Sequence, residues 1–309
     1  MIQKYAFSIM IVTYNPIWEK LKLTLDAIIE QNFKDYELII VDDGSKNNLE
    51  NEICSYMHRN PIKNFRHIKN EVNQGTVRNI ISGLCHCSGE YVKVFGPGDY
   101  FAANDSLETV HSYLKKNKLD VCWGLVKSYV NTTNEKREFI YRAHPLDIEA
   151  YRKYDVERIR ENLIYYSDSA HGASIFIKTE KFRHYLEMIE PYVRYAEDLI
   201  QIPIALDEEP IHLMDEEIIC YEVGAGISTA KKSGTYKLLE RDVHDLYEML
   251  EKKYPENRYL IKRKKIKKFY AIKNLYLRTM CRFFVNPGMV IFLTRALGQR
   301  IRHRHYRCS

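Results

Sequence analysis

The first hundred residues alternate between short apolar runs and longer segments whose apolar residues recur at helical spacing. The apolar runs cover residues 7–12, 36–41 and 91–95, and the helical segments include residues 18–31 and 75–87. Near-continuous apolar runs of this length are typical of strands that are buried on both faces of a parallel sheet. Strands that alternate with helices over short links indicate βαβ units, so we expect an α/β fold with right-handed crossovers.

Each of these strands ends in polar, turn-forming residues. Thr13-Tyr14-Asn15 follows the first strand, Asp42-Asp43 follows the second, and Asp99 follows the third after Gly96-Pro97-Gly98. The carboxyl ends of parallel strands meet at one edge, so an aromatic ring and several carboxylates gather there and predict a crevice sized for a nucleotide. The alternative is structural: Asp99 caps the helix near Asn104, and Asp42-Asp43 are a helix-capping pair.

The second half of the chain has a weaker pattern. Residues 120–129 and 139–141 predict two paired strands, and residues 146–170 predict loops and short helices. Residues 171–179 predict a loop that leads into a strand, and a helix follows. Glu197-Asp198 stand at the start of another helix, where a helix dipole alone also favours acids.

Four segments in the first hundred residues carry a resemblance to a known family. They are SIMIVTYN (8–15), YELIIVDDGS (36–45), NQGTVRN (73–79) and SGEY (88–91). In this order and spacing they resemble the successive motifs of family 2 glycosyltransferases with the GT-A fold. The resemblance implies a Rossmann-like, mostly parallel sheet flanked by helices, and an enzyme that uses a nucleotide-sugar donor.

The resemblance also implies a nucleotide-binding set, which consists of Thr13, Tyr14, Asn15, Asp43, Arg78 and Asp99. Tyr14 would stack on the nucleobase. Asp43 would accept the N–H of a uracil edge, and Arg78 would offer its planar donors to the diphosphate. The structural alternatives are a solvated helix arginine and a capping pair of acids.

A second implied set serves the transfer step. Tyr195-Ala196-Glu197-Asp198 resembles the Glu-Asp motif of the family, which assigns Asp198 as the general base. Such a base takes the proton of an acceptor hydroxyl as its oxygen attacks the anomeric carbon, with inversion in a single displacement. Glu197 and His171 are predicted on the acceptor side or behind the base, although a lone histidine often only satisfies a local hydrogen bond.

The turn before Asp99 departs from the family pattern. The family usually has acids at the positions of Gly96 and Gly98, where they bind the ribose and hold Mn²⁺ or Mg²⁺ against the diphosphate. Only Asp99 remains here. Water and phosphate supply most ligands of such an ion, so we expect Mn²⁺ or Mg²⁺ with Asp99 as its protein ligand. The alternative is a diphosphate neutralised by Arg or Lys side chains alone.

Charge separates the last sixty residues from the rest. Residues 251–309 contain 17 Lys or Arg and 2 Asp or Glu, a balance of +15, so residues 1–250 carry 6 − 15 = −9. Helices are predicted at residues 237–253 and 258–285, after a strand region at 211–221 that three acids interrupt. Basic helices with interleaved aromatic residues favour an anionic membrane surface. Packing on the catalytic domain or on a second subunit is the alternative, and nucleic acid is not expected.

These patterns predict a catalytic domain at residues 1–230, with a nucleotide-binding half at 1–105 and an acceptor half at 106–230. A basic, aromatic helical region follows at 231–309. The chain has no segment of the length of a membrane span, and its seven scattered cysteines show no zinc spacing. We therefore expect a cytoplasmic protein with peripheral contact to the inner face of the membrane; a homo-oligomer is left open.

The predicted function is that of an inverting glycosyltransferase. It would move a hexosyl or N-acetylhexosaminyl group from a UDP-sugar to a hydroxyl of a glycan or lipid-linked glycan during surface polysaccharide synthesis, such as capsule or lipopolysaccharide. A non-catalytic scaffold of the same fold is the second hypothesis, motivated by Gly96 and Gly98. A nucleotidyltransferase would need a Gly-rich loop after the first strand, and residues 13–16 do not form one.

Overall fold

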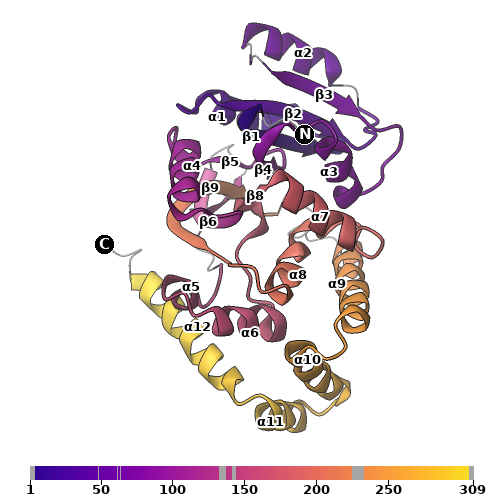
Figure 1. The fold of residues 1–309 in the computed structure, drawn as a ribbon, viewed down its shortest axis with the longest axis vertical. Coiled ribbons are helices and arrows are strands. Elements are labelled where there is room, and N and C mark those ends of the chain that lie inside the picture. Colours follow the sequence, from indigo (N-terminus) through magenta and orange to yellow (C-terminus); the bar gives the residue numbers. More distant parts are fainter. Residues whose placement is uncertain are drawn as a thin grey trace.

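The computed structural model describes residues 4–47, 49–60, 62, 64–131, 137–140, 144–224 and 233–305 (Figure 1). The strands are β1 Tyr5–Thr13, β2 Tyr36–Asp42, β3 Phe65–Lys69, β4 Gly89–Phe95, β5 Tyr100–Phe101, β6 Val121–Asn131, β7 Arg137–Ile140, β8 Ile175–Lys178 and β9 Leu213–Glu222. The first eight α-helices are α1 Trp18–Ile29, α2 Glu50–Arg59, α3 Thr76–Leu84, α4 Ser106–Asn117, α5 Ile148–Arg152, α6 Val156–Tyr166, α7 Thr179–Ile189 and α8 Gln201–Leu206. The last four are α9 Ser233–Lys253, α10 Arg258–Lys268, α11 Leu275–Val285 and α12 Gly288–His305, and the 3-10 turns are η1 Gly172–Ser174, η2 Glu197–Ile200 and η3 Phe269–Ala271.

The strands form one sheet in the order β3-β2-β1-β4-β8-β6-β9-β5, with β7 paired to β6. The half made by β3, β2, β1 and β4 is parallel, as predicted. In its register Thr13 lies opposite Asp42, and Ile11 lies opposite Phe95. The tips of β1, β2 and β4 therefore meet at one edge of the sheet. The second half is mixed: β8 joins β4 and β6 in antiparallel pairs, whereas β9 runs parallel to β6.

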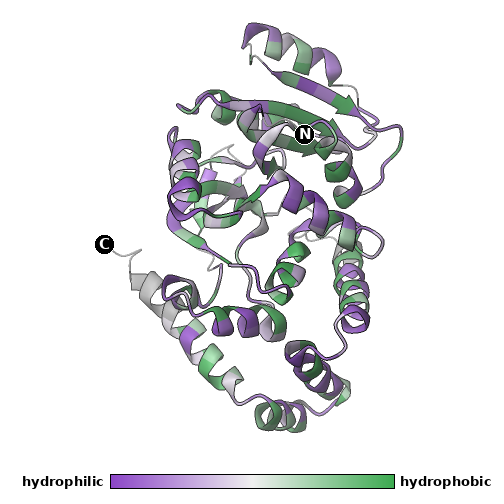
Figure 2. Ribbon diagram, in the orientation of Figure 1, coloured by the Kyte–Doolittle hydropathy of each residue, from purple (hydrophilic) through white to green (hydrophobic). Residues whose placement is uncertain are grey.

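Apolar side chains cover both faces of the parallel half. All seven residues of β2 are buried, as its continuous apolar run predicts. One core cluster joins the sheet to α3, α6, α7, α8 and α9, and the other joins it to α1, α2 and α4. Figure 2 shows the apolar residues concentrated in these central strands. This burial fixes the positions from which the strand tips emerge.

The predicted interruption of the strand at 211–221 is wrong, and one neighbouring strand was not predicted. Asp215, Glu216 and Glu217 are exposed within a continuous strand and do not interrupt it, because the pairing with β6 shifts register opposite Trp123–Leu125. Such an irregularity lets several successive polar side chains face solvent. The short strand β5, directly after Asp99, was not predicted; two residues are too few to give a periodic signal.

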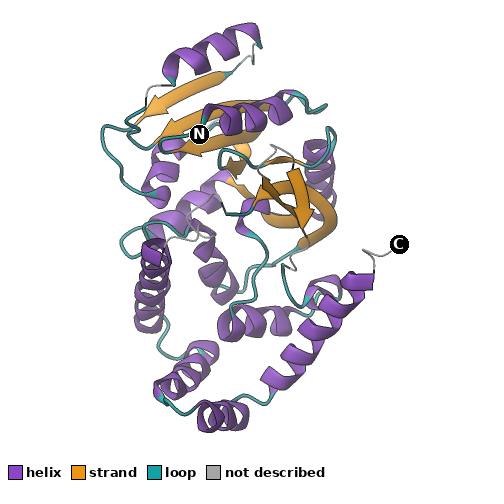
Figure 3. Ribbon diagram, turned by 180° about the vertical axis from the view of Figure 1, so that it is seen from behind, coloured by secondary structure: helices purple, strands orange, loops and turns teal. Residues whose placement is uncertain are grey.

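The predicted single helix over residues 258–285 is wrong, because the chain forms α10, η3 and α11 there. Asn274 caps the start of α11, since its side chain accepts the backbone N–H of Leu277 at 3.0 Å. In Figures 1 and 3, α9 to α12 form an arc that leaves the body at α9 and returns along α5 and α6. The rings of Phe292 and Tyr166 stack there at 4.4 Å.

The predicted domain boundary near residue 230 falls in 225–232, outside the described residues. On its far side, Leu246, Tyr247 and Leu250 of α9 are buried in the same core cluster as α3 and α7. The first helix of the basic region thus shares a core with the sheet domain.

Candidate active site

The tips of β1 and β2 are held together by backbone hydrogen bonds. Asp43 N donates to the carbonyl oxygen of Thr13 at 2.8 Å, and Asn15 N donates to Ser45 Oγ at 2.7 Å. Asn15 itself has a φ of 47°, a left-handed conformation that asparagine tolerates better than most residues. Tyr14, between these anchors, is 50% exposed. The turn therefore presents an aromatic ring at the edge where a base is predicted to stack.

Asp43 is buried and holds the loop that opens α3. Its Oδ1 accepts the backbone N–H of Gln74 at 2.9 Å, and its Oδ2 accepts that of Gly75 at 2.8 Å. Asn70 Nδ2 also donates to Oδ1, at 3.3 Å. This carboxylate joins the segment 36–45 to the segment 73–79. Three donors of the protein already bind its two oxygens, so it has little capacity left to accept a hydrogen bond from a ligand.

Arg78 lies on α3, where its Nε donates to the carboxylate of Glu190 at the end of α7. Its side chain is 58% exposed. Within the described residues, no hydrogen bond or ion pair joins Arg78 to Tyr14, Asp43 or Asp99. Tyr14 and Asp43 therefore lie at the joined tips of β1 and β2, whereas Arg78 is paired with Glu190 at the end of α7.

The turn from Gly96 to Asp99 is anchored on α1 and β9. Gly98 N donates to Thr24 Oγ1 at 3.0 Å, and Asp99 Oδ1 accepts the backbone N–H of Glu222 at 3.1 Å. Gly98 has a φ of 104°, and a Cβ there would lie 2.4 Å from Glu222 Oε2. The alternative that Asp99 caps a helix is not what its contacts show. Glu222 occupies the space that a side chain at position 98 would need.

Glu197 and Asp198 form the turn η2, which leads directly into α8. Asp198 packs on Gly172 of η1, where a Cβ would come within 2.5 Å of Asp198 Cβ. The neighbouring His171 accepts the backbone N–H of Ala173 through Nδ1 at 3.2 Å, and its ring lies 4.4 Å from that of Tyr221. The predicted base and the predicted histidine therefore border the same short turn.

The sequence interpretation missed Lys93, which lies at the centre of this group. Its side chain is fully buried in β4, and its Nζ donates to the carbonyl oxygens of Ala173, at 2.7 Å, and Val94. The ammonium also lies 4.0 Å from the centre of the Phe95 ring. A lysine in the middle of an otherwise apolar buried strand was the available signal. Glu222, at the end of β9, was missed because nothing nearby marks a motif.

Burial shifts the pKa values of four of these groups. It raises the pKa of Asp99 to about 7 and raises that of Asp198. Burial, followed by the charge of Asp198, raises the pKa of Glu197 to about 8. Burial lowers the pKa of Lys93 to about 7, against the opposing influence of Asp99 and Glu197. Acids that hold their protons this tightly suit proton transfer near neutral pH.

The loop before Glu197 is held by an acid of the C-terminal region. Asp242 of α9 is buried, and its carboxylate accepts three consecutive backbone N–H groups, those of Arg194 at 3.1 Å, Tyr195 at 2.7 Å and Ala196 at 3.0 Å. Because these residues lead directly into η2, α9 fixes where the predicted base lies.

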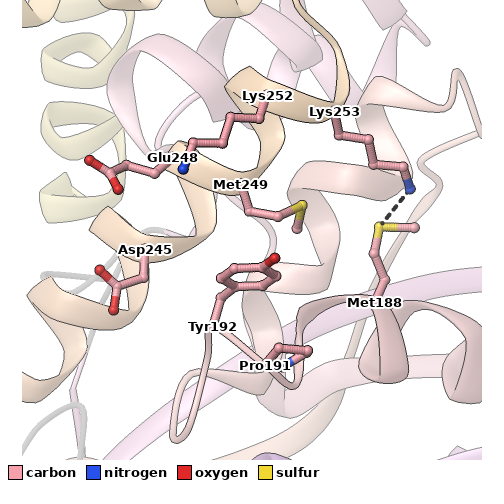
Figure 4. Close-up of a pocket in the computed structure, with 8 residues that line it drawn as sticks. All are labelled: Met188, Pro191, Tyr192, Asp245, Glu248, Met249, Lys252 and Lys253. Carbon is pink, nitrogen blue, oxygen red and sulfur yellow. Dashed lines mark hydrogen bonds between the residues drawn. The ribbon is translucent and has the colours of Figure 1, made fainter.

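Two surface pockets lie beside this loop and not over the acid cluster. One, of about 630 Å³, lies between α7 and α9, where Tyr192 and Met249 face each other (Figure 4). The other, of about 570 Å³, is lined by Arg78, Arg194 and Asp242 among others. Among the described residues, no group of three or more His, Cys, Asp or Glu side chains could hold a metal ion.

The chain is similar to known glycosyltransferases. Residues 8–179 match the model of the family described as Glycosyl transferase family 2. TarP of Staphylococcus aureus, a poly(ribitol-phosphate) beta-N-acetylglucosaminyltransferase, is 36% identical over 121 residues, which are 38% of this chain and 35% of TarP. The matched regions span 20% to 40% of the first curated relatives' own length.

Two solved structures have a similar fold over nearly the whole chain. S. aureus TarS 1–349 in complex with UDP-GlcNAc gives a TM-score of 0.54 at 17% identity, over 94% of this chain and 81% of that one. The mannosyltransferase PcManGT of Pyrobaculum calidifontis, in complex with GDP-Man and Mn²⁺, gives 0.56 at 14% identity, over 96% and 87%. At such identities the likeness shows the fold alone, and it confirms the predicted GT-A fold class.

Proposed function

Because this chain belongs to glycosyl transferase family 2, we propose that it transfers a sugar from a nucleoside diphosphate sugar to a hydroxyl of a glycan or lipid-linked glycan. The proposed catalytic domain covers residues 1–230, with the donor half at 1–105 and the acceptor half at 106–230. The observation that carries the proposal is one grouping. Asp99, Glu197 and Asp198 share a partly buried cluster, next to the sheet edge where Tyr14 and Asp43 stand.

Asp198 is the proposed general base. Its carboxylate takes the proton of the acceptor hydroxyl while that oxygen forms its bond to the anomeric carbon. The bond from that carbon to the diphosphate breaks on the opposite face, and the nucleoside diphosphate leaves with the electron pair. The anomeric centre is inverted because one displacement occurs. The raised pKa of Asp198 supports this role, since a stronger base accepts a proton more readily.

The donor is proposed to lie between the β1 and β2 tips and Asp99. Tyr14 stacks on the base, while Thr13 and Asn15 shape the turn beneath it. Arg78 reaches the diphosphate only after it leaves Glu190, and His171 and Glu197 line the acceptor side. TarS was solved with UDP-GlcNAc, which supports UDP as the nucleotide. TarP acts on poly(ribitol-phosphate), which supports a surface glycan as the acceptor class.

The helices α11 and α12 are proposed to rest on an anionic membrane surface on its cytoplasmic side. They expose a set of large apolar side chains: Tyr276, Leu277, Met280, Phe284, Ile291, Leu293 and Leu297. The charge balance of +15 over residues 251–309 suits anionic headgroups. Among the described helices, none alone has the length and apolarity to cross a bilayer; 276–285 and 288–298 reach it only as a pair bent by 105°.

Titration calorimetry with a panel of nucleoside diphosphates, followed by a transfer assay, tests the function. We expect UDP to bind and a UDP-sugar to be consumed in the presence of a suitable glycan acceptor. The second candidate is a non-catalytic scaffold, which the missing acids at Gly96 and Gly98 favour. Nucleotide binding without turnover on any donor would support the scaffold, and no binding of any nucleotide would reject the transferase and leave the scaffold as the remaining candidate.

Cosedimentation with liposomes tests the membrane proposal. The full chain should sediment with vesicles that contain phosphatidylglycerol and should stay in solution with neutral vesicles. Replacing Phe284 and Ile291, both exposed, by serine should release it without a change in melting temperature. Equal sedimentation of the variant and the wild type would contradict the proposal.

A further inference from the structure

The turn at Gly96 to Asp99 is poorly built to hold a divalent cation. Asp99 is its single acid, and Gly98 cannot be replaced by an acid without displacing Glu222. Glu222 does place a second carboxylate there, but its Oε1 is already committed. It accepts from Lys20 Nζ at 2.7 Å and from Asn131 Nδ2 at 2.7 Å. Its Oε2 faces Gly98 and is buried without a hydrogen-bond partner among the described residues. The turn therefore offers Asp99 and one further carboxylate oxygen, while the other oxygen of Glu222 is held by a protein cation and an amide.

Lys93, on the strand that leads into this turn, places a positive charge close enough to interact with Asp99. It emerges from β4 three residues before the turn, and its Nζ is held by Ala173 O, one residue from Gly172, on which Asp198 packs. Its charge interacts with those of Asp99 and Glu197. Among the described residues, no carboxylate lies within 4 Å of this ammonium, so it is held by carbonyl oxygens and is not locked in a close ion pair.

A buried ammonium without a close counter-charge is costly unless something compensates it. A diphosphate that enters beside Asp99 carries negative charge into a region that already holds the carboxyl groups of Asp99, Glu197 and Asp198. Transfer builds more negative charge on the leaving diphosphate, and fixed cations stabilise such charge. The lysine and the incoming phosphate would thus each offset a cost of the other.

We propose that the Lys93 ammonium supplies the positive charge that a divalent cation would otherwise supply beside Asp99, so that the donor binds and reacts without metal. This inference rests on the proposed function. It replaces the metal role predicted for Asp99: that carboxylate faces the donor and Lys93 and is not a metal ligand. PcManGT, solved with Mn²⁺, has the same fold, so the difference would lie in the site residues and not in the fold.

The competing interpretation is that Lys93 is only a core residue that satisfies Ala173 and Val94. Both interpretations predict some loss of stability on replacement. Only the proposed one predicts that donor affinity depends on Lys93 and is indifferent to metal. Position 96 offers a way to separate them, since a Cβ on Gly96 would meet only Asp99 Oδ2, at 3.6 Å. A carboxylate can therefore be added there without displacing backbone.

Calorimetric titration of UDP is the test, with each protein measured in EDTA and in Mn²⁺. The wild type should bind equally in both, within about twofold, whereas Lys93→Met should bind at least tenfold more weakly in EDTA. Lys115→Met is the matched control, because it removes the same charge from an exposed pair with Glu90 and should bind like the wild type. The double variant Lys93→Met with Gly96→Asp should regain affinity in Mn²⁺ and not in EDTA.

Each outcome has a distinct meaning. Wild-type binding that disappears in EDTA and returns with Mn²⁺ would overturn the inference and leave the proposed function intact. A folded Lys93→Met protein with unchanged affinity in EDTA would also overturn it. Failure of every nucleoside diphosphate to bind, with and without Mn²⁺, would overturn the proposed function and this inference together. The wild-type comparison needs no variant and holds even if Lys93→Met does not fold.

Discussion

The two ends of the candidate site use carboxylates in different ways. At the β1 and β2 tips, Asp43 accepts two backbone N–H groups and one side-chain amide, and it ties the opening of α3 to the sheet. At the β4 tip, Asp99 accepts one backbone N–H and shares its surroundings with Lys93 and Glu197. The first end is shaped by hydrogen bonds, and the second holds charge. A motif acid can therefore act by holding the backbone of a neighbouring segment in place.

The largest expected effect is a loss of transfer rate on replacement of Asp198, with nucleotide binding unchanged. Asp198→Asn removes the proposed base and keeps the size of the side chain that packs on Gly172. The transfer rate should fall by about 100- to 10,000-fold, the usual contribution of a general base. The UDP affinity should stay within about twofold, because the nucleotide end is untouched. Initial-rate kinetics and calorimetry measure the two quantities, and a turnover close to that of the wild type would exclude Asp198 as the base.

Asp43→Ala should instead weaken UDP binding, because Asp43 lies at the nucleotide end of the site. It leaves the N–H groups of Gln74 and Gly75 without their acceptor, and a buried donor left unsatisfied costs about 1–3 kcal/mol. We expect weaker UDP binding, by roughly tenfold, together with a lower melting temperature. Asp43→Asn is the milder companion, since one amide oxygen still accepts. If Asp43→Ala lost stability and kept its affinity, Asp43 would be a structural residue alone.

The dependence of melting temperature on pH tests the raised pKa of Glu197, near Asp99 and Asp198. The pKa of Glu197 rises from 4.5 to about 8 on folding, because of burial and Asp198. A carboxyl whose pKa is raised in the folded state stabilises the protein fully below the unfolded pKa and loses that effect as pH rises through the folded pKa. Glu197→Gln should therefore gain melting temperature relative to the wild type as pH rises from 5 to 8. A constant difference across that range would contradict the shift.

The parallel half of the fold and the edge of the site could be predicted from the sequence, because the near-continuous apolar runs of β1, β2 and β4 are typical of buried parallel strands. The resemblance to the family motifs singled out Asp43 after the second strand and Asp198 in the Glu-Asp pair, and the roles of both stay predictions. Lys93 and Glu222 could not be found in this way. Their roles depend on contacts between distant parts of the chain. Lys93 of β4 contacts Ala173 of η1, 80 residues away, and Asp99 contacts Glu222 of β9, 123 residues away. No local sequence pattern predicts such contacts.

The smallest expected effect concerns Arg78, which the sequence placed on the diphosphate and the structure pairs with Glu190. The pair is exposed, with Arg78 at 58% and Glu190 at 25%, and exposed pairs contribute about 0–1 kcal/mol. If Arg78 leaves Glu190 to meet the diphosphate, Glu190→Gln should strengthen UDP binding by up to about fivefold, because the competing partner is gone. Arg78→Gln should weaken binding, and in the double variant Glu190→Gln should have no further effect. Unchanged affinity in both single variants would remove Arg78 from the donor site and leave Tyr14 and Asp43 as the nucleotide end.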